Sequence, residues 1–154
     1  MAAKTFRDTR AWQSAMDAAV AVRDVSKNID ADQATTLTDP LRLTSAGIAT
    51  TIADAWRLRT RPSEFVDTLG TAEGLCAKTL TWLELAVRIG AITKEQAAPL
   101  MVKFEEIATQ LAHMIEQPEK WATSKETYYG TSNLVAEALK KQRSGTSGRQ
   151  PKQS

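Results

Sequence analysis

Apolar residues recur every three or four positions through most of the first 117 residues, and they fall into four segments. This spacing places side chains on one face of an α-helix, whereas a half-buried strand would need strict alternation. The pattern predicts helices over about 9–27, 39–59, 63–89 and 94–117. The expected core-facing residues are Trp12, Ala15, Met16, Ala19, Val22 and Val25, then Leu41, Ile48, Ile52 and Trp56, then Phe65, Leu69, Ala72, Cys76, Leu80, Leu83 and Val87, and finally Leu100, Phe104, Ile107, Leu111, Met114 and Ile115.

Four amphipathic helices joined by short connections predict an all-α protein, an antiparallel up-and-down four-helix bundle. The bundle is expected to occupy residues 1–118, because Pro118 ends the last strong apolar stripe. A C-terminal extension over 119–143 and a disordered basic tail over 144–154 are expected to follow.

Capping residues predict where the first two helices begin. Asp8 or Thr9 can cap the first helix by accepting a hydrogen bond from an amide of its first turn. Thr38 or Asp39 can do the same for the second helix, where Pro40 stands at a position that needs no amide donor.

Breaks later in the chain separate the third and fourth helices. The bond before Pro62 disfavours helical geometry, and Ser63 is the expected cap of the third helix. Gly90 can take the left-handed conformation that closes this helix. Thr93 and Gln96 then have the spacing of a capping box at the start of the fourth helix.

Small residues are concentrated within the second helix, where residues 44–51 read TSAGIATT. Small side chains let a neighbouring helix approach closely, so this segment is expected to pack tightly; a loosely packed, exposed face is the alternative. Gly70 and Gly74 in the third helix indicate either a close helix crossing or a slight kink.

The C-terminal third has a weaker pattern. Trp121, Tyr128 and Tyr129 are expected to dock on another surface, and residues 132–142 can form a short amphipathic helix. No apolar run reaches the roughly 20 residues that cross a bilayer, and the first residues lack the apolar core of a secretory signal. We therefore expect a soluble, cytoplasmic protein without a membrane partner.

No arrangement of residues points to catalysis, a metal or a cofactor. The single cysteine, Cys76, lies on an apolar helix face and is expected in the core. The single histidine, His113, has Glu116 one turn later but no second His or Cys to complete a metal site, so a rim or core position is expected. There is also no phosphate-binding glycine loop and no nucleophile with a partner base.

Positive charge is unevenly distributed along the chain. Residues 1–118 carry 13 Lys and Arg against 15 Asp and Glu, whereas residues 119–154 carry 7 against 3. A cluster of arginines nevertheless lies at the end of the second helix. The candidate nucleic-acid-binding residues are Arg42, Arg57, Arg59 and Arg61, with Lys140, Lys141 and Arg143 in the extension and Arg149 and Lys152 in the tail.

The stretch around the second helix resembles a bacterial four-helix bundle family. The family includes proteins encoded by intervening sequences in large-subunit ribosomal RNA genes, and it is related to accessory variability determinants of diversity-generating retroelements. The resemblance covers roughly residues 6–117. The residues that carry it are Leu37, Thr38, Leu41, Arg42, Ile48, Ile52, Ala53, Trp56, Glu64 and Phe65, with Trp12 and Gln13 upstream and Ala72, Gly74, Gly90, Ala91, Ile92 and Thr93 downstream.

The resemblance implies a homopentameric ring of bundles. Trp56 and Trp82 lie at the edges of their stripes, where they can pack between subunits; completing the core of a single subunit is the alternative. Kinship with retroelement accessory proteins implies RNA or DNA as a partner, and a reverse transcriptase or another protein as a second one.

Two functions are compatible with these observations. The first is a non-enzymatic, oligomeric accessory protein that binds nucleic acid through the clustered arginines and the basic tail, because guanidinium groups pair well with phosphates. The second is a protein-interaction or assembly scaffold with no nucleic-acid role. Sensitivity to salt separates them, since phosphate binding weakens steeply with added salt and apolar docking does not.

Overall fold

The protein is helical throughout the described part of the computed structural model, which comprises residues 3–122 and 133–146. Within these two ranges there are five α-helices and no strand, so the all-α prediction is confirmed. The α-helices are α1 (Arg10–Ser26), α2 (Asp39–Trp56), α3 (Pro62–Arg88), α4 (Lys94–Glu116) and α5 (Asn133–Thr146). Shorter turns are η1 (Phe6–Asp8), η2 (Ala31–Gln33), the π-type η3 (Ala34–Thr38) and η4 (Pro118–Lys120).

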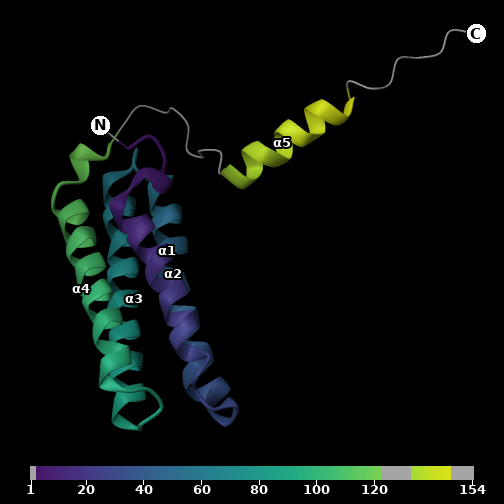
Figure 1. The fold of residues 1–154 in the computed structure, drawn as a ribbon. Coiled ribbons are helices and arrows are strands. Elements are labelled where there is room, and N and C mark those ends of the chain that lie inside the picture. Colours follow the sequence, from purple (N-terminus) through teal and green to yellow (C-terminus); the bar gives the residue numbers. More distant parts are fainter. Residues whose placement is uncertain (1–2, 123–132, 147–154) are drawn as a thin grey trace, which may run out of the picture.

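The four long helices lie side by side (Figure 1). Helix α1 packs against α2 and α4, and α3 packs against the same two helices. The α1–α2 and α3–α4 connections lie at one end of the molecule, and the α2–α3 connection lies at the other. Helix α5 stands apart from the long helices in this view. Among the described helices, none is both long and apolar enough to cross a bilayer.

The start of α1 follows the predicted capping, but the starts of α2 and α3 do not. The hydroxyl of Thr9 accepts a hydrogen bond from the amide of Trp12 at 3.3 Å. The side chain of Thr38 caps nothing, because Thr38 is itself helical (φ −62°, ψ −49°) and α2 continues the preceding π-type turn. Ser63 is not a cap either: α3 begins one residue earlier, at Pro62, where proline needs no partner for an amide.

The turn between α3 and α4 is built as predicted. Gly90 has φ 76°, and the amide of Ala91 closes α3 on the carbonyl of Ala86 at 2.8 Å. The hydroxyl of Thr93 accepts from the amide of Gln96 at 3.1 Å, and the side chain of Gln96 accepts from the amide of Thr93 at 2.9 Å. The capping box is therefore confirmed.

The buried faces of α3 and α4 follow the predicted stripes, whereas the buried face of α1 is rotated. The buried residues of α1 are Ala11, Ala15, Ala18, Val22 and Ser26. Met16, predicted to be in the core, is 42% exposed. Bulky residues dominate an apolar pattern, but α1 has to fit between α2 and α4, and its alanines make that close approach possible.

Tight packing of the small-residue segment is supported at Gly47. A Cβ atom added there would lie 3.2 Å from Cδ1 of Leu75 in α3, closer than ordinary van der Waals contact. Gly70 and Gly74 differ, since an added Cβ would meet nothing within 4 Å in the described structure. Of the two alternatives for these glycines, the close crossing is therefore excluded within the described chain.

Cys76 lies in the core, as predicted. Burial raises the pKa of its thiol to about 12, and the negative charge of Glu73 adds to the effect. The thiol is thus protonated at neutral pH and a poor nucleophile.

Candidate nucleic-acid interface

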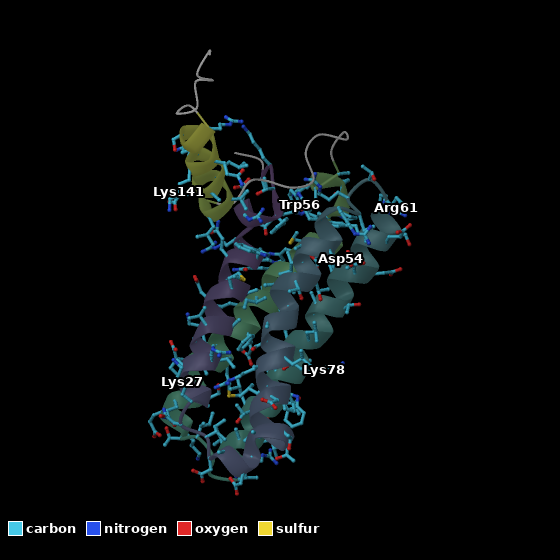
Figure 2. All side chains as sticks on the ribbon, turned by 90° about the vertical axis from the view of Figure 1, so that its right-hand side faces the viewer. Lys27, Asp54, Trp56, Arg61, Lys78 and Lys141 are labelled. Carbon is cyan, nitrogen blue, oxygen red and sulfur yellow. The ribbon has the colours of Figure 1, made fainter. Side chains whose placement is uncertain are left out.

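The clustered arginines lie at the end of the molecule where α2 passes into α3. Because neighbouring helices run in opposite directions, α1 begins and α4 ends at this same end, which we call the arginine end. Figure 2 shows Trp56 and Arg61 toward it and Lys27 toward the opposite end. The described cationic residues of the arginine end are Lys4, Arg7, Arg10, Arg57, Arg59, Arg61 and Lys120.

Arg57 and Arg61 are accessible and each pairs with a nearby carboxylate. Nε of Arg57 lies 2.7 Å from Oδ1 of Asp54, and Nη1 of Arg61 lies 2.9 Å from Oε1 of Glu64. The arginine side chains are 48% and 56% exposed. Exposed ion pairs contribute about 0–1 kcal/mol to stability, so a phosphate can replace either carboxylate at little cost.

Arg59, between them, has a different environment. It is 3% exposed, and its guanidinium carbon lies 3.8 Å from the centroid of the Trp56 ring. Such a cation–π contact stabilises the fold when it is shielded from water. In this conformation Arg59 packs the α2–α3 turn and does not present its charge to solvent.

The predicted interface tryptophans are also in different environments. Trp56 is 1% exposed, so almost none of its surface is left for a second copy of the chain. Trp121 packs against it edge to face, with the ring centroids 6.1 Å apart and the planes at 71°. Trp121 thus docks on α2 of its own chain. Trp82 is half-buried and retains surface that a second subunit can cover.

Arg42 lies far from the other arginines. It belongs to the first turn of α2, about 22 Å along the helix axis from Arg57 at 1.5 Å per residue. Its Nε donates to the hydroxyl of Ser26, at the end of α1, at 2.7 Å. The structure therefore gives Arg42 a contact between helices at the opposite end of the molecule.

The basic residues of the extension lie on α5. Lys140, Lys141 and Arg143 are exposed, and so are the apolar side chains of Leu134, Val135 and Leu139. Helix α5 continues to Thr146, past position 144, where the tail was expected to begin. The predictions for Tyr128, Tyr129, Arg149 and Lys152 concern positions outside the described residues.

A pocket of about 580 Å³ opens at the arginine end. It lies between the start of α1, the end of α4 and the turn η4. No local pattern marks Arg10 or Lys120, because they line one pocket only once α1 and α4 pack in opposite directions. The lining residues are Thr9, Arg10, Ala11, Gln110, His113, Met114, Glu116, Gln117, Lys120 and Trp121.

His113 lies exposed on the wall of this pocket, a rim position of the kind predicted. Over residues 3–122 and 133–146, no group of three or more His, Cys, Asp and Glu side chains comes together in a way that could hold a metal ion. The pocket offers a ligand two cationic side chains, Arg10 and Lys120, one carboxylate, Glu116, and the aromatic ring of Trp121.

Comparison with known families gives one match. The family model described as 23S rRNA-intervening sequence protein matches residues 7–113, which include α1, α2, α3 and most of α4. The search of curated proteins gave no match.

Proposed function

Because the chain belongs to the 23S rRNA-intervening sequence protein family, we propose that it is a non-enzymatic accessory protein that binds nucleic acid at the arginine end. The observation that carries the proposal is the pair of accessible arginines, Arg57 and Arg61, on either side of the α2–α3 turn. Guanidinium groups form paired hydrogen bonds to phosphates. The family name, which refers to ribosomal RNA, favours RNA over DNA.

The proposal includes an assembly. The contacts of α1 and α3 with both α2 and α4 support an antiparallel four-helix bundle. A homopentamer of such bundles, related to retroelement accessory proteins, would repeat Arg57 and Arg61 five times around a ring. Repetition converts weak phosphate contacts into strong binding through avidity. Apolar side chains left exposed on the long helices are available to a neighbouring subunit; they are Met16, Val20, Leu43, Leu85, Ile89 and Val102.

The basic residues of α5 add a second, less specific contribution. Lys140, Lys141 and Arg143 are exposed on one short helix and can approach the backbone of a bound strand. Their effect should depend on charge alone, so lysine and arginine are interchangeable at these positions. Placement of the protein in the cytoplasm is part of the same proposal.

The test is binding of a fluorescently labelled 20-nucleotide RNA, followed by anisotropy over a range of salt concentrations. The variant Arg57→Gln/Arg61→Gln removes both accessible arginines. We expect weaker binding and a slope of log K against log salt that is shallower by about 1.4, since each phosphate contact to a single strand contributes about 0.7.

A matched control lies at the opposite end of the molecule. Lys27 and Arg88 are also exposed cations that pair with acids on their own helices, Asp24 and Glu84. The variant Lys27→Gln/Arg88→Gln loses the same charge from equivalent surroundings. Equal losses in the two double variants would show that net charge, and not the arginine end, binds the RNA.

A second candidate function is a protein-interaction scaffold, which the exposed apolar side chains of α5 favour. Leu134, Val135 and Leu139 would dock on a partner protein, such as a reverse transcriptase or another protein. Binding of this kind should persist at high salt, because burial of apolar surface is not screened. The scaffold would be favoured if the protein captures the partner at 1 M salt and the variant Leu134→Ser/Leu139→Ser does not. Capture that is lost at high salt would argue against it.

A further inference from the structure

The pocket at the arginine end has the composition of a nucleotide site. Arg10, at the start of α1, and Lys120, in η4, contribute two cationic side chains from segments far apart in the chain. Glu116 contributes one acid, so the lining is cationic overall, with His113 as an additional donor. This balance suits a single phosphodiester better than a triphosphate.

The start of α1 reinforces the positive potential. Thr9, Arg10 and Ala11, the cap and the first two residues of the helix, all line the pocket. The N-terminus of a helix carries a partial positive charge and favours an anion nearby. Charged side chains and helix polarity therefore act in the same direction here.

Trp121 gives the pocket an aromatic wall. Its indole is half-buried and held in place by the edge-to-face contact with Trp56. Every base has a face that can stack on an aromatic side chain, so this contact does not depend on the sequence of the strand. An aromatic wall beside two cations is the combination that proteins use for single-stranded nucleic acid.

Gln110 adds a polar side chain to the wall of the pocket. It lines the pocket, and its side-chain oxygen is buried without a hydrogen-bond partner among the described residues. Buried acceptors usually have a hydrogen-bond partner. Because this oxygen is closed off from solvent, a ligand in the pocket reaches it only if the side chain of Gln110 rotates.

We propose that the pocket holds one nucleotide of a bound RNA strand, with its base on Trp121 and its phosphate between Arg10 and Lys120. The volume of about 580 Å³ lies within the usual range of small-molecule sites. This assignment rests on the proposed function, which it deepens: Arg57 and Arg61 hold the strand along the α2–α3 turn, and the pocket holds one of its residues.

The experiment uses the full chain and mononucleotides, so that it does not depend on strand binding. Binding of AMP, ribose 5-phosphate and inorganic phosphate is measured by isothermal titration calorimetry. We expect saturable AMP binding, with ribose 5-phosphate at least fivefold weaker because it cannot stack. Equal affinity for AMP and inorganic phosphate would reduce the site to an anion site and overturn the proposal, as would the absence of saturable AMP binding.

Variants then locate the site. Arg10 and Lys120 are exposed, so Arg10→Gln/Lys120→Gln should fold normally, and we expect it to lose AMP affinity at least tenfold. Lys27→Gln/Arg88→Gln should bind AMP as the wild type does. Unchanged AMP affinity in Arg10→Gln/Lys120→Gln would overturn the proposal.

The two proposals can fail separately. AMP binding without any binding of the 20-nucleotide RNA would sustain the pocket and remove the strand-binding function. RNA binding that depends on Arg57 and Arg61, in a protein that does not bind AMP, would sustain the function and remove the pocket.

Discussion

The two ends of the long helices carry similar exposed ion pairs but are built in different ways. At the opposite end the α3–α4 turn is closed by local features, the left-handed Gly90 and the capping box of Thr93 and Gln96. A pocket near that turn measures about 290 Å³ and is lined by residues of α3 alone. The arginine end combines α1, α2, α3, α4 and η4, and its pocket is about twice as large.

This difference separates residues that close a helix from residues that could form a ligand site. Residues within one turn of each other can close a helix, but a site that recognises a ligand from several sides requires segments that are distant in sequence. Trp56 is the centre of the assembled end, since Arg59 packs over its ring and Trp121 packs against its edge. The contrast between the ends predicts four effects, from the largest to the smallest.

The largest effect is expected for Trp56→Ala. Removing a fully buried tryptophan should lower the free energy of unfolding by about 3–5 kcal/mol and release both Arg59 and Trp121. Urea denaturation measures the loss. Trp82→Ala is the control, because that side chain is half-buried; a loss at Trp82 as large as that at Trp56 would contradict the central role of Trp56.

Stability should also depend on the pH through Cys76, which lies between the two ends. Its thiol ionises near pH 9 in the unfolded chain and near pH 12 when folded. The unfolded state therefore loses the proton first, and the free energy of unfolding should fall as the pH rises above 9, by at most about 1.4 kcal/mol per pH unit. Below pH 9 this contribution is fully present.

The measurement is urea denaturation of wild type and Cys76→Ala at pH 8, 9 and 10. The stability difference between the two proteins isolates the thiol from the titrating lysines. This difference should be nearly constant between pH 8 and 9. Above pH 9 the wild type should lose stability relative to Cys76→Ala. A difference that is independent of pH up to 10 would show that the thiol ionises normally in the folded protein.

Glycine substitutions test the local construction of the opposite end. Gly90→Ala should cost about 1–2 kcal/mol, because alanine tolerates the left-handed conformation poorly. Gly74→Ala should instead stabilise by about 0.5–1 kcal/mol, since the added methyl group lies in open space in the middle of α3. Thermal unfolding measures both changes. An effect of the same sign at the two glycines would show that Gly90 is not required for the left-handed turn or that Gly74 does not lie in open space.

The smallest effect is a change in RNA affinity, which should differ between the two ends. Asp54→Asn and Asp24→Asn each remove the acid from an exposed ion pair, so both should change stability by less than about 1 kcal/mol. Asp54→Asn removes a carboxylate that competes with phosphate for Arg57, so RNA affinity should rise about two- to fivefold, as expected for a pair of this strength. Asp24→Asn should raise it less, and an equal gain would indicate a general charge effect.

The sequence predicted the α3–α4 turn, which depends on neighbouring residues, but not the starts of α2 and α3. Proline, glycine and the Thr93–Gln96 spacing act within a single turn, so the end of α3 and the start of α4 were predictable. The rotated face of α1 was not, because alanines such as Ala11 and Ala18 are buried by the fit between helices and not by their own hydrophobicity.

The site was predictable in part, for the same reason. Arg57 and Arg61 follow a helix and precede a proline, which indicates an exposed turn. Arg59 stands in the same run, yet only the packing of Trp56 decides that its guanidinium is buried. Arg10 and Lys120 are 110 positions apart, and no local pattern indicates that they line one pocket.

The central claim is that RNA contacts the arginine end. Photo-crosslinking of a 4-thiouridine-containing RNA, followed by mass spectrometry of the peptides, tests it most directly. We predict crosslinks within residues 54–65, and within 8–13 and 117–122 around the pocket. Crosslinks confined to α5, or to residues 23–32 and 84–95 at the opposite end, would contradict the account.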